Sequence, residues 1–278
     1  FSRGEERPIY FCPRPETVNL PMQIEGGDDG QEKNLKKIRY IETELFKQIL
    51  SGVKDIKLTD ENIAGSYVSG SALKLRSLLE KENCEAIIRS EPYQHVHLPR
   101  DFGQDSEPYF VDKLYFHEQA GLFFLLDTEG LPEVEHQVLS AMKLLADSGI
   151  GTDRNTGNGH FEIEIDEIEL DVPNTESYQM SLSLYWPTQK EIETCASKSF
   201  YGLTKRGGYI SSPANVEHLT IRKRSVYMFT EGSIFPYQAA RRGRLGDLHP
   251  LDFDPLQHPI WRDGQPIFLP INLESHDS

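Results

Sequence analysis

Residues 121–166 read GLFFLLDTEGLPEVEHQVLSAMKLLADSGIGTDRNTGNGHFEIEID and hold the clearest structural pattern in the chain. The apolar run at 121–127 predicts a strand, and Pro132 suits the first turn of a helix. Apolar side chains then recur at the helical period and give that helix one buried face: Val134, Val138, Met142 and Leu145. The first half of the stretch is therefore predicted to be a strand followed by an amphipathic helix.

The second half of the stretch is predicted to be a glycine loop and another strand. Gly149 is the expected helix cap, and further glycines follow up to Gly159. From Phe161 to Asp166 apolar and acidic residues alternate, which predicts a half-buried strand. The order strand, helix, glycine loop, strand is that of the second half of a ferredoxin-like βαββαβ unit, so the predicted fold class is α+β.

Weaker patterns lie on either side of this stretch. A strand at 38–41 precedes an amphipathic helix whose apolar residues are Leu45, Phe46, Ile49 and Leu50. The polar, irregular region at 95–119 is predicted to be a long hairpin or lid. Pro173-Asn174 is the expected junction to a second block of strands, which the sequence predicts at 180–186, 208–210 and 225–229.

The charge of the chain is large but unevenly distributed. Its 278 residues allow one large domain or two, and a net charge of −15 argues at face value against nucleic acid as the main partner. A hydrophobic content of 37% excludes a disordered or collagen-like chain. The stretch 201–244 has a net charge of +6, whereas 160–180 has −7 and the residues after Arg244 have −5. A basic surface can therefore coexist with the acidic total.

Cysteine spacing and apolar runs restrict the cellular setting. Cys12, Cys84 and Cys195 are far apart and lack zinc-site spacing, which favours a reducing compartment and no structural zinc. The longest apolar run, 122–126, is far shorter than the roughly 18 residues that span a bilayer. The chain begins with Phe1 rather than Met, which predicts either a removed start or a fragment.

The glycine loop at 149–159 is the most informative candidate site. Glycines allow close backbone approach to a phosphate, and successive N–H groups can bind an anion. The loop is neither a Walker loop nor a dinucleotide fingerprint, because no Gly-Lys-Ser/Thr opens a helix and the loop precedes a strand. Nucleoside triphosphate binding is therefore disfavoured, and the open alternatives are a phosphate cradle and a plain surface turn.

Basic residues form a second group of candidates. In the positive stretch they are Lys205, Arg206, Arg222, Lys223, Arg224, Arg241 and Arg242, and glycine or aromatic residues lie nearby. Phosphate contacts and a solvated face are both consistent with such clusters. Lys74 and Arg76 follow Ser69 and Ser71, which are possible helix caps, so either a phosphate-binding helix start or an exposed amphipathic helix is predicted there.

The nine histidines do not form a recognisable catalytic or metal-binding set. A Gly-x-Ser-x-Gly elbow is absent, and no third ligand accompanies His95 and His97, so neither a nucleophilic triad nor a metal site is expected. His160 beside the glycine loop is either a base or an exposed polar residue.

Short motifs occur in one order along most of the chain. They are Ser69-Gly70-Ser71-Ala72-Leu73-Lys74-Leu75-Arg76, Ser106-Glu107-Pro108-Tyr109-Phe110-Val111, Ala120-Gly121-Leu122-Phe123-Phe124, Asp147-Ser148-Gly149-Ile150-Gly151, Gly157-Asn158-Gly159-His160-Phe161, Arg206-Gly207-Gly208-Tyr209, Arg222-Lys223-Arg224-Ser225-Val226-Tyr227-Met228 and His258-Pro259-Ile260. This ordered set resembles the RAMP superfamily of CRISPR systems, and within it the proteins that form subunit four of the Csm (type III-A) effector complex.

The resemblance implies a particular architecture. It comprises tandem ferredoxin-like (RRM-like) domains at 1–172 and 173–278, the first without its N-terminal part. A protruding β-hairpin thumb is implied at about 93–117, and it would include His97, Arg100 and Phe102 and kink the guide RNA.

The resemblance also implies a function. It is that of a non-catalytic, cytoplasmic subunit that holds the 5′ handle of the CRISPR RNA (crRNA) and caps the base of an antiviral ribonucleoprotein. The implied protein partners are the large cyclase/nuclease subunit and the backbone RAMP subunit, with no cofactor, metal or membrane. In the glycine loop, handle phosphates would lie against Gly149, Gly151, Gly157 and Gly159, with Arg154 and Asn155 nearest the RNA.

Two rival functions remain open. One is a RAMP endoribonuclease that processes CRISPR RNA with His160 as base, although such enzymes usually end soon after the glycine loop and 119 residues follow Gly159 here. The other is a protein-only scaffold. The acidic total predicts that the isolated chain binds RNA weakly and that its acidic strips face solvent or basic partner surfaces.

Overall fold

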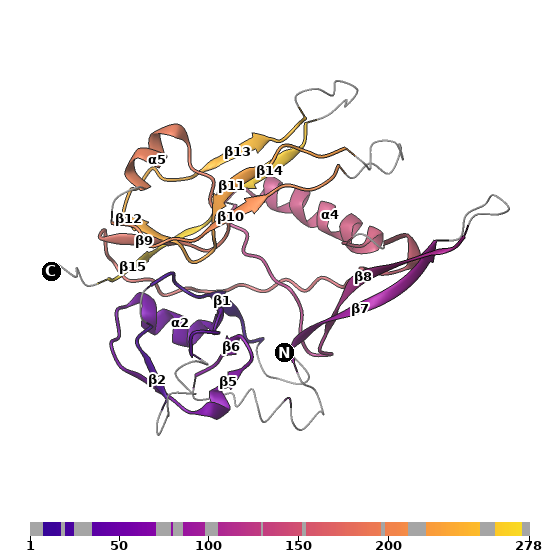
Figure 1. Cartoon of the computed structure of the whole chain (residues 1–278). Coiled ribbons are helices and arrows are strands. Elements are labelled where there is room, and N and C mark those ends of the chain that lie inside the picture. The colour runs from indigo at the N-terminus through magenta and orange to yellow at the C-terminus, as the bar shows by residue number, and fades with distance from the viewer. Residues whose placement is uncertain are drawn as a thin grey trace. The chain divides into compact units, whose positions relative to one another are not determined.

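The computed structural model describes eleven parts of the chain (Figure 1): residues 8–17, 20–24, 35–70, 79, 86–97, 105–128, 130–151, 154–195, 198–210, 221–250 and 259–273. The fold is mixed α+β, with short helices and several small sheets. Two compact units are present, Phe1–Gly121 with Asp171–Ser278, and Leu122–Leu170. No helix in the described part of the chain is long and apolar enough to cross a membrane.

In its described residues, the first part of the larger unit contains a small sheet, a parallel strand pair and a helix with a buried face. The sheet has the order β1-β3-β6-β5, with β1 at Phe11–Pro13, β3 at Tyr40–Glu42, β5 at Ile63–Ala64 and β6 at Tyr67–Val68. Helix α2 (Thr43–Leu50) buries Leu45, Phe46, Ile49 and Leu50, which confirms the predicted amphipathic helix. A parallel pair, β2 (Met22–Ile24) and β4 (Ile56–Leu58), and the 3₁₀ turn η1 (Asp60–Asn62) complete this part.

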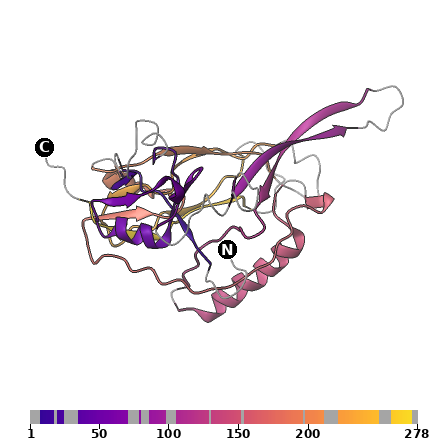
Figure 2. The ribbon, with the colours of Figure 1, turned by 90° about the horizontal axis from the view of Figure 1, so that it is seen from below.

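A long antiparallel ladder follows. Strands β7 (Ile88–His97) and β8 (Glu107–Phe116) pair from Ile88↔Phe116 to His97↔Glu107, and they run side by side in both views (Figures 1 and 2). This ladder lies where the sequence predicts a long hairpin, but it begins before the predicted boundary at residue 93. Its use as a thumb stays a prediction.

The last part of the larger unit is built on aromatic packing. Strands β12 (Ile234–Pro236), β9 (Tyr178–Ser181) and β15 (Phe268–Ile271) form a sheet in that order. Two further antiparallel pairs are β10 (Leu203–Arg206) with β11 (Val226–Phe229), and β13 (Arg244–Asp247) with β14 (Trp261–Gly264). Helix α5 spans Gln189–Cys195. The core joins Tyr185, Cys195, Phe229 and Phe235, with Phe268 packed against them.

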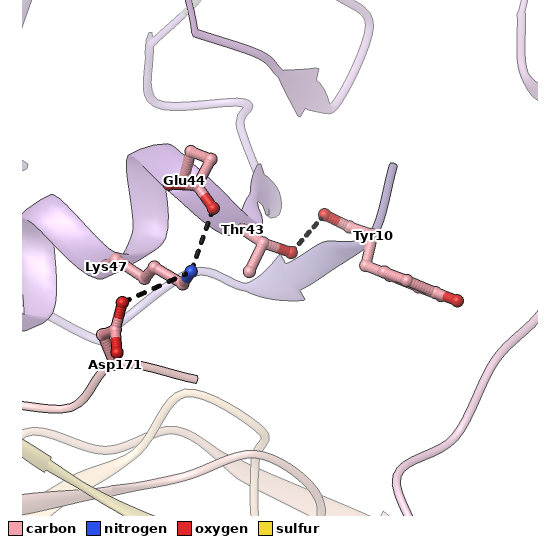
Figure 3. A network of polar contacts seen from close by, with 5 residues as sticks. All are labelled: Tyr10, Thr43, Glu44, Lys47 and Asp171. Atoms are coloured by element: carbon pink, nitrogen blue, oxygen red, sulfur yellow. Dashed lines mark hydrogen bonds and ion pairs between the residues drawn. The ribbon is translucent and has the colours of Figure 1, made fainter. Parts of the chain in front are cut away.

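Polar contacts join the first and last parts of this unit. In Figure 3 the ammonium of Lys47 lies 3.0 Å from Glu44 Oε1 and 3.9 Å from Asp171 Oδ2, so α2 is linked to the beginning of the last part. Within the first part, the hydroxyl of Thr43 donates to the carbonyl of Tyr10 at 2.9 Å and ties the start of α2 to the segment before β1. The backbone N–H of Asn272 donates to the carbonyl of Leu50 at 2.9 Å, which ties the end of β15 to the end of α2.

The smaller unit contains helix α4 (Pro132–Ser148) between two extended segments. The predicted helix start at Pro132 and the cap at Gly149 are confirmed, because Gly149 has a φ of +79° and its N–H donates to the carbonyl of Leu145. The strands predicted at 121–127 and 161–166 are wrong, since neither segment pairs with a neighbouring strand in the described chain. The buried helix face is also wrong, because α4 buries no residue.

Candidate nucleic-acid interface

Strands β10 and β11 carry one exposed cation–aromatic pair. Their register places Lys205 opposite Tyr227, and the Lys205 ammonium lies 6.0 Å from the centre of the Tyr227 ring. Tyr227 is 65% exposed, whereas its neighbour Met228 is fully buried. Because successive side chains of a strand point to opposite faces, β11 anchors itself with Met228 and presents Tyr227 to solvent.

A second pair extends this surface beyond the ladder. Tyr209 and Arg222 form an isolated bridge, and Arg222 Nη2 donates to the Tyr209 hydroxyl at 3.0 Å. The guanidinium lies 5.0 Å from the centre of the Tyr209 ring, which is 55% exposed. Gly208, with a φ of +118°, gives the backbone before Tyr209 a conformation that other residues rarely adopt. We refer to Lys205, Tyr209, Arg222 and Tyr227 as the basic–aromatic surface.

Further cations border the basic–aromatic surface. Arg206 is exposed at the end of β10, and Arg224 donates from Nη2 to the carbonyl of Asp247 at 2.6 Å, which ties this region to β13. Burial lowers the pKa of Lys223, and the nearby charge of Arg262 lowers it further. Because Lys223 and Arg262 lie near each other, the local electrostatic potential is positive, and an anion such as phosphate would be attracted to it.

The β13–β14 pair adds another stacked cation. The Arg244 guanidinium lies 4.1 Å from the centre of the Trp186 ring, and Trp261 on β14 is 60% exposed. The carboxylate of Asp247 accepts hydrogen bonds from the N–H groups of Ile260 and His249, which lowers its pKa and fixes the end of β13. The sequence prediction missed Trp186, Trp261 and Arg262, because an isolated Trp or Arg carries no signal until a strand pairing brings it beside another group.

This arrangement suits single-stranded nucleic acid. Exposed aromatic faces can stack on bases, and adjacent Lys and Arg side chains can bind the phosphates between them. Arginine beside an aromatic ring adds a cation–π attraction, and the planar fork of donors in its guanidinium matches the geometry of a phosphate. Of the predicted residues, the structure brings Lys205, Arg206, Arg222, Lys223 and Arg224 into this region.

The prediction that Arg241 binds RNA requires correction. Arg241 is only 4% exposed, and its guanidinium donates to Cys195 Sγ at 2.8 Å and to the Tyr185 hydroxyl at 3.3 Å. A phosphate cannot reach a guanidinium that is enclosed by the aromatic core. Its neighbour Arg242 is exposed, so Arg242 stays in the candidate set.

The predicted glycine loop lies in the smaller unit and closes on itself. The N–H of Ile150 donates to the carbonyl of Gly159 at 2.9 Å, and a 3₁₀ turn, η2 (Arg154–Thr156), fills the middle. The backbone φ is positive at Gly149, Gly151, Gly157 and Gly159, a conformation that favours glycine and is compatible with both a phosphate cradle and a plain surface turn. Arg154 is half-buried, and the RNA contact of Arg154 and Asn155 stays a prediction.

Several other predicted residues are not described in full. Lys74, Arg76, Arg100 and Phe102 lie outside the described residues. For His97 the structure gives the backbone, which pairs with Glu107 at the end of the β7–β8 ladder.

Comparison with known proteins identifies the class of the last part of the chain. The family described as "CRISPR Csm4 C-terminal domain" matches residues 174–271, a range that contains the whole basic–aromatic surface. Residues 174–271 therefore form a domain of the kind found in CRISPR-associated proteins.

Curated relatives extend the match over most of the chain. A protein named "CRISPR system Cms protein Csm4" from Methanocaldococcus jannaschii is 26% identical, over 95% of this chain and 79% of the relative. Proteins of the same name from Thermococcus onnurineus and Streptococcus thermophilus are 31% and 26% identical. Each of these two alignments covers 72% of this chain, with 59% and 67% of the relative respectively. The chain belongs to the Csm4 family.

Proposed function

We propose that this protein is the non-catalytic RNA-binding subunit of a type III-A CRISPR ribonucleoprotein and that it anchors the 5′ handle of the crRNA. The observation that carries the proposal is the basic–aromatic surface, which lies within the part that matches the Csm4 C-terminal domain. Membership of the Csm4 family supports a role as one subunit of a larger complex, because the relatives are named as proteins of a CRISPR system.

In this proposal the protein binds and orients the RNA without cleaving it. Two bases of the handle stack on Tyr209 and Tyr227, and the phosphates between them contact Lys205 and Arg222. Stacking on an aromatic ring contributes about 1–3 kcal/mol per base, so two rings can supply most of a moderate affinity. Arg206, Lys223, Arg224 and Arg242 add sequence-independent attraction along the backbone.

The proposal includes a wider assembly. The protein caps the base of the complex, where it contacts the large cyclase/nuclease subunit and the backbone RAMP subunit in the cytoplasm. Its domains at 1–172 and 173–278 are ferredoxin-like, and the β7–β8 ladder is the thumb. The exposed faces of that ladder support this assignment, because Tyr93 and Lys113 form a cation–π pair at 4.1 Å on one of them.

A binding experiment with the full chain tests the proposal. We expect Tyr209→Ala/Tyr227→Ala to weaken binding of a fluorescent single-stranded handle RNA about 100-fold, because both stacking platforms are lost. Lys57→Ala, which removes an exposed cation of β4, is the matched control and leaves the affinity within about twofold. Unchanged affinity in the double variant would reject the basic–aromatic surface as the RNA site.

The rival enzyme function has its own readout. Incubation of the protein with repeat RNA, without added metal, is expected to yield no cleavage. Specific cleavage that disappears in His160→Ala would replace this proposal with a RAMP endoribonuclease. Failure of the full complex to retain RNA contacts on this chain would instead favour a protein-only scaffold.

A further inference from the structure

The turn Arg241–Arg244, called the basic turn below, places its first arginine inside the core and two others outside it. Arg241 is buried, whereas Arg242 and Arg244 are exposed. Three arginines within four residues therefore have two different environments, and the backbone between them determines where the exposed pair is presented.

The buried end of the basic turn is fixed by Arg241. Its guanidinium stacks 5.1 Å from the centre of Phe235 and donates from Nη2 to Thr194 Oγ1 and the carbonyl of Pro236. Nη1 donates to the Cys195 thiol and the Tyr185 hydroxyl. Within the described chain its Nε has no hydrogen-bond partner, and no carboxylate forms an ion pair with it. A charge buried with mainly neutral partners is costly, so its placement points to a structural requirement.

The middle of the basic turn is fixed by Glu191. This side chain is 5% exposed, and its Oε1 accepts hydrogen bonds from the N–H groups of Arg242 at 2.7 Å and Gly243 at 3.1 Å. Its Oε2 accepts from the N–H of Thr188 at 2.7 Å. Burial alone would raise the pKa of Glu191, but these backbone hydrogen bonds outweigh burial and leave the pKa below its ordinary value. The carboxylate therefore stays ionised at neutral pH.

The exit of the basic turn is fixed by backbone pairing. Gly243 has a φ of +79°, and a Cβ there would overlap the carbonyl of Gly264. The N–H of Arg244 donates to the carbonyl of Trp186 at 2.9 Å, and Arg244 then stacks on the Trp186 ring. Arg242 and Arg244 are thus presented from a backbone that is held on both sides.

We infer that Glu191 and Arg241 are positioning residues for RNA, which hold the basic turn so that Arg242 and Arg244 meet phosphates. The inference rests on the proposed function and adds Arg244 to the RNA-contacting groups. Neither Glu191 nor Arg241 touches RNA, and both act through the backbone of the turn.

The test compares Glu191→Ala with Glu191→Gln in the full chain, using fluorescent single-stranded RNA over a series of salt concentrations. Loss of two phosphate contacts reduces the slope of log affinity against log salt by about 1.4, because each contact on a single strand contributes about 0.7. We expect this reduced slope in Glu191→Ala. Glu191→Gln keeps an oxygen acceptor for the N–H groups of Arg242 and Gly243, so it is expected to restore most of the slope.

A double-variant comparison separates positioning from general destabilisation. In an Arg242→Ala/Arg244→Ala background, Glu191→Ala is expected to change RNA affinity less than twofold, since the groups that it positions are already gone. A further loss in that background, or a wild-type slope in Glu191→Ala, would overturn the inference. These outcomes are independent of the result for Tyr209→Ala/Tyr227→Ala. If that double variant binds RNA weakly while Glu191→Ala has the wild-type slope of log affinity against log salt, only the positioning role is rejected.

Discussion

Arg222 and Arg241 each combine a guanidinium with a tyrosine, but one pair lies at the surface and the other inside the core. Arg222 lies 5.0 Å from the ring of Tyr209 and bonds its hydroxyl at 3.0 Å. Arg241 lies 5.9 Å from the ring of Tyr185 and bonds its hydroxyl at 3.3 Å. The same pair of residue types is therefore available to a ligand where solvent reaches it, as the proposed RNA contact requires, and anchors the core where solvent does not.

The largest expected effect is on stability. Arg241→Ala removes the buried guanidinium together with its hydrogen bonds to the Tyr185 hydroxyl, the Cys195 thiol and the Pro236 carbonyl, so the free energy of unfolding falls by about 3 kcal/mol. Arg222→Ala changes it by less than about 0.5 kcal/mol, because its site is exposed. Urea denaturation measures both. Equal losses in the two variants would contradict the division between anchoring and recognition.

A smaller effect is expected on RNA affinity at the surface pair. Arg222→Ala weakens binding of single-stranded RNA about 10-fold, because a phosphate contact and the support of the Tyr209 ring are both lost. Arg222→Lys keeps the charge but not the planar stacking group, so an intermediate affinity is expected. Fluorescence anisotropy measures this series, and identical affinities for the Lys and Ala variants would show that charge at this position is irrelevant.

The two tyrosine hydroxyls give a more sensitive comparison. Tyr185→Phe removes a buried acceptor from Arg241 and is expected to lower the free energy of unfolding by about 1 kcal/mol. Tyr209→Phe keeps the stacking ring and is expected to leave RNA affinity within about twofold. Thermal or urea denaturation checks the first change and RNA titration the second. A larger stability loss in Tyr209→Phe than in Tyr185→Phe would reverse the assignment of the two pairs.

The smallest expected effect is a pH dependence carried by Glu191. Its pKa in the folded protein lies below the ordinary value of 4.5, so the folded state binds fewer protons than the unfolded state in this range. The resulting stability is present above about pH 4.5 and is lost as the pH falls through the folded pKa. Urea midpoints measured between neutral and acidic pH should fall less steeply in Glu191→Gln than in the wild type. Parallel curves would exclude Glu191 as the source.

Local sequence pattern predicted the elements that form from neighbouring residues. The spacing of Leu45, Phe46, Ile49 and Leu50 gives α2, and Pro132 and Gly149 mark the limits of α4. The strands expected at 121–127 and 161–166 did not form ladders, because an apolar run or an alternating pattern indicates a preference for extended chain but not the presence of a pairing partner.

The candidate site was predictable in composition but not in geometry. The positive stretch 201–244 indicated where cations gather, and Lys205 and Arg222 lie on the basic–aromatic surface. Sequence could not separate Arg241 from Arg242, because burial there depends on Tyr185, Cys195 and Phe235, which come from other elements. Similarly, Trp186 meets Arg244 only because backbone hydrogen bonds join two segments that are distant in the sequence.

Ultraviolet crosslinking of single-stranded handle RNA to the full chain, followed by mass spectrometry of its peptides, would identify the side chains that contact bases. Aromatic side chains that stack on bases form adducts efficiently because they lie in contact with the base. We expect adducts on Tyr209 and Tyr227, and these adducts should diminish when unlabelled RNA competes. Adducts confined to other segments such as 149–159, with the Tyr209 and Tyr227 peptides unmodified, would contradict the proposed RNA site.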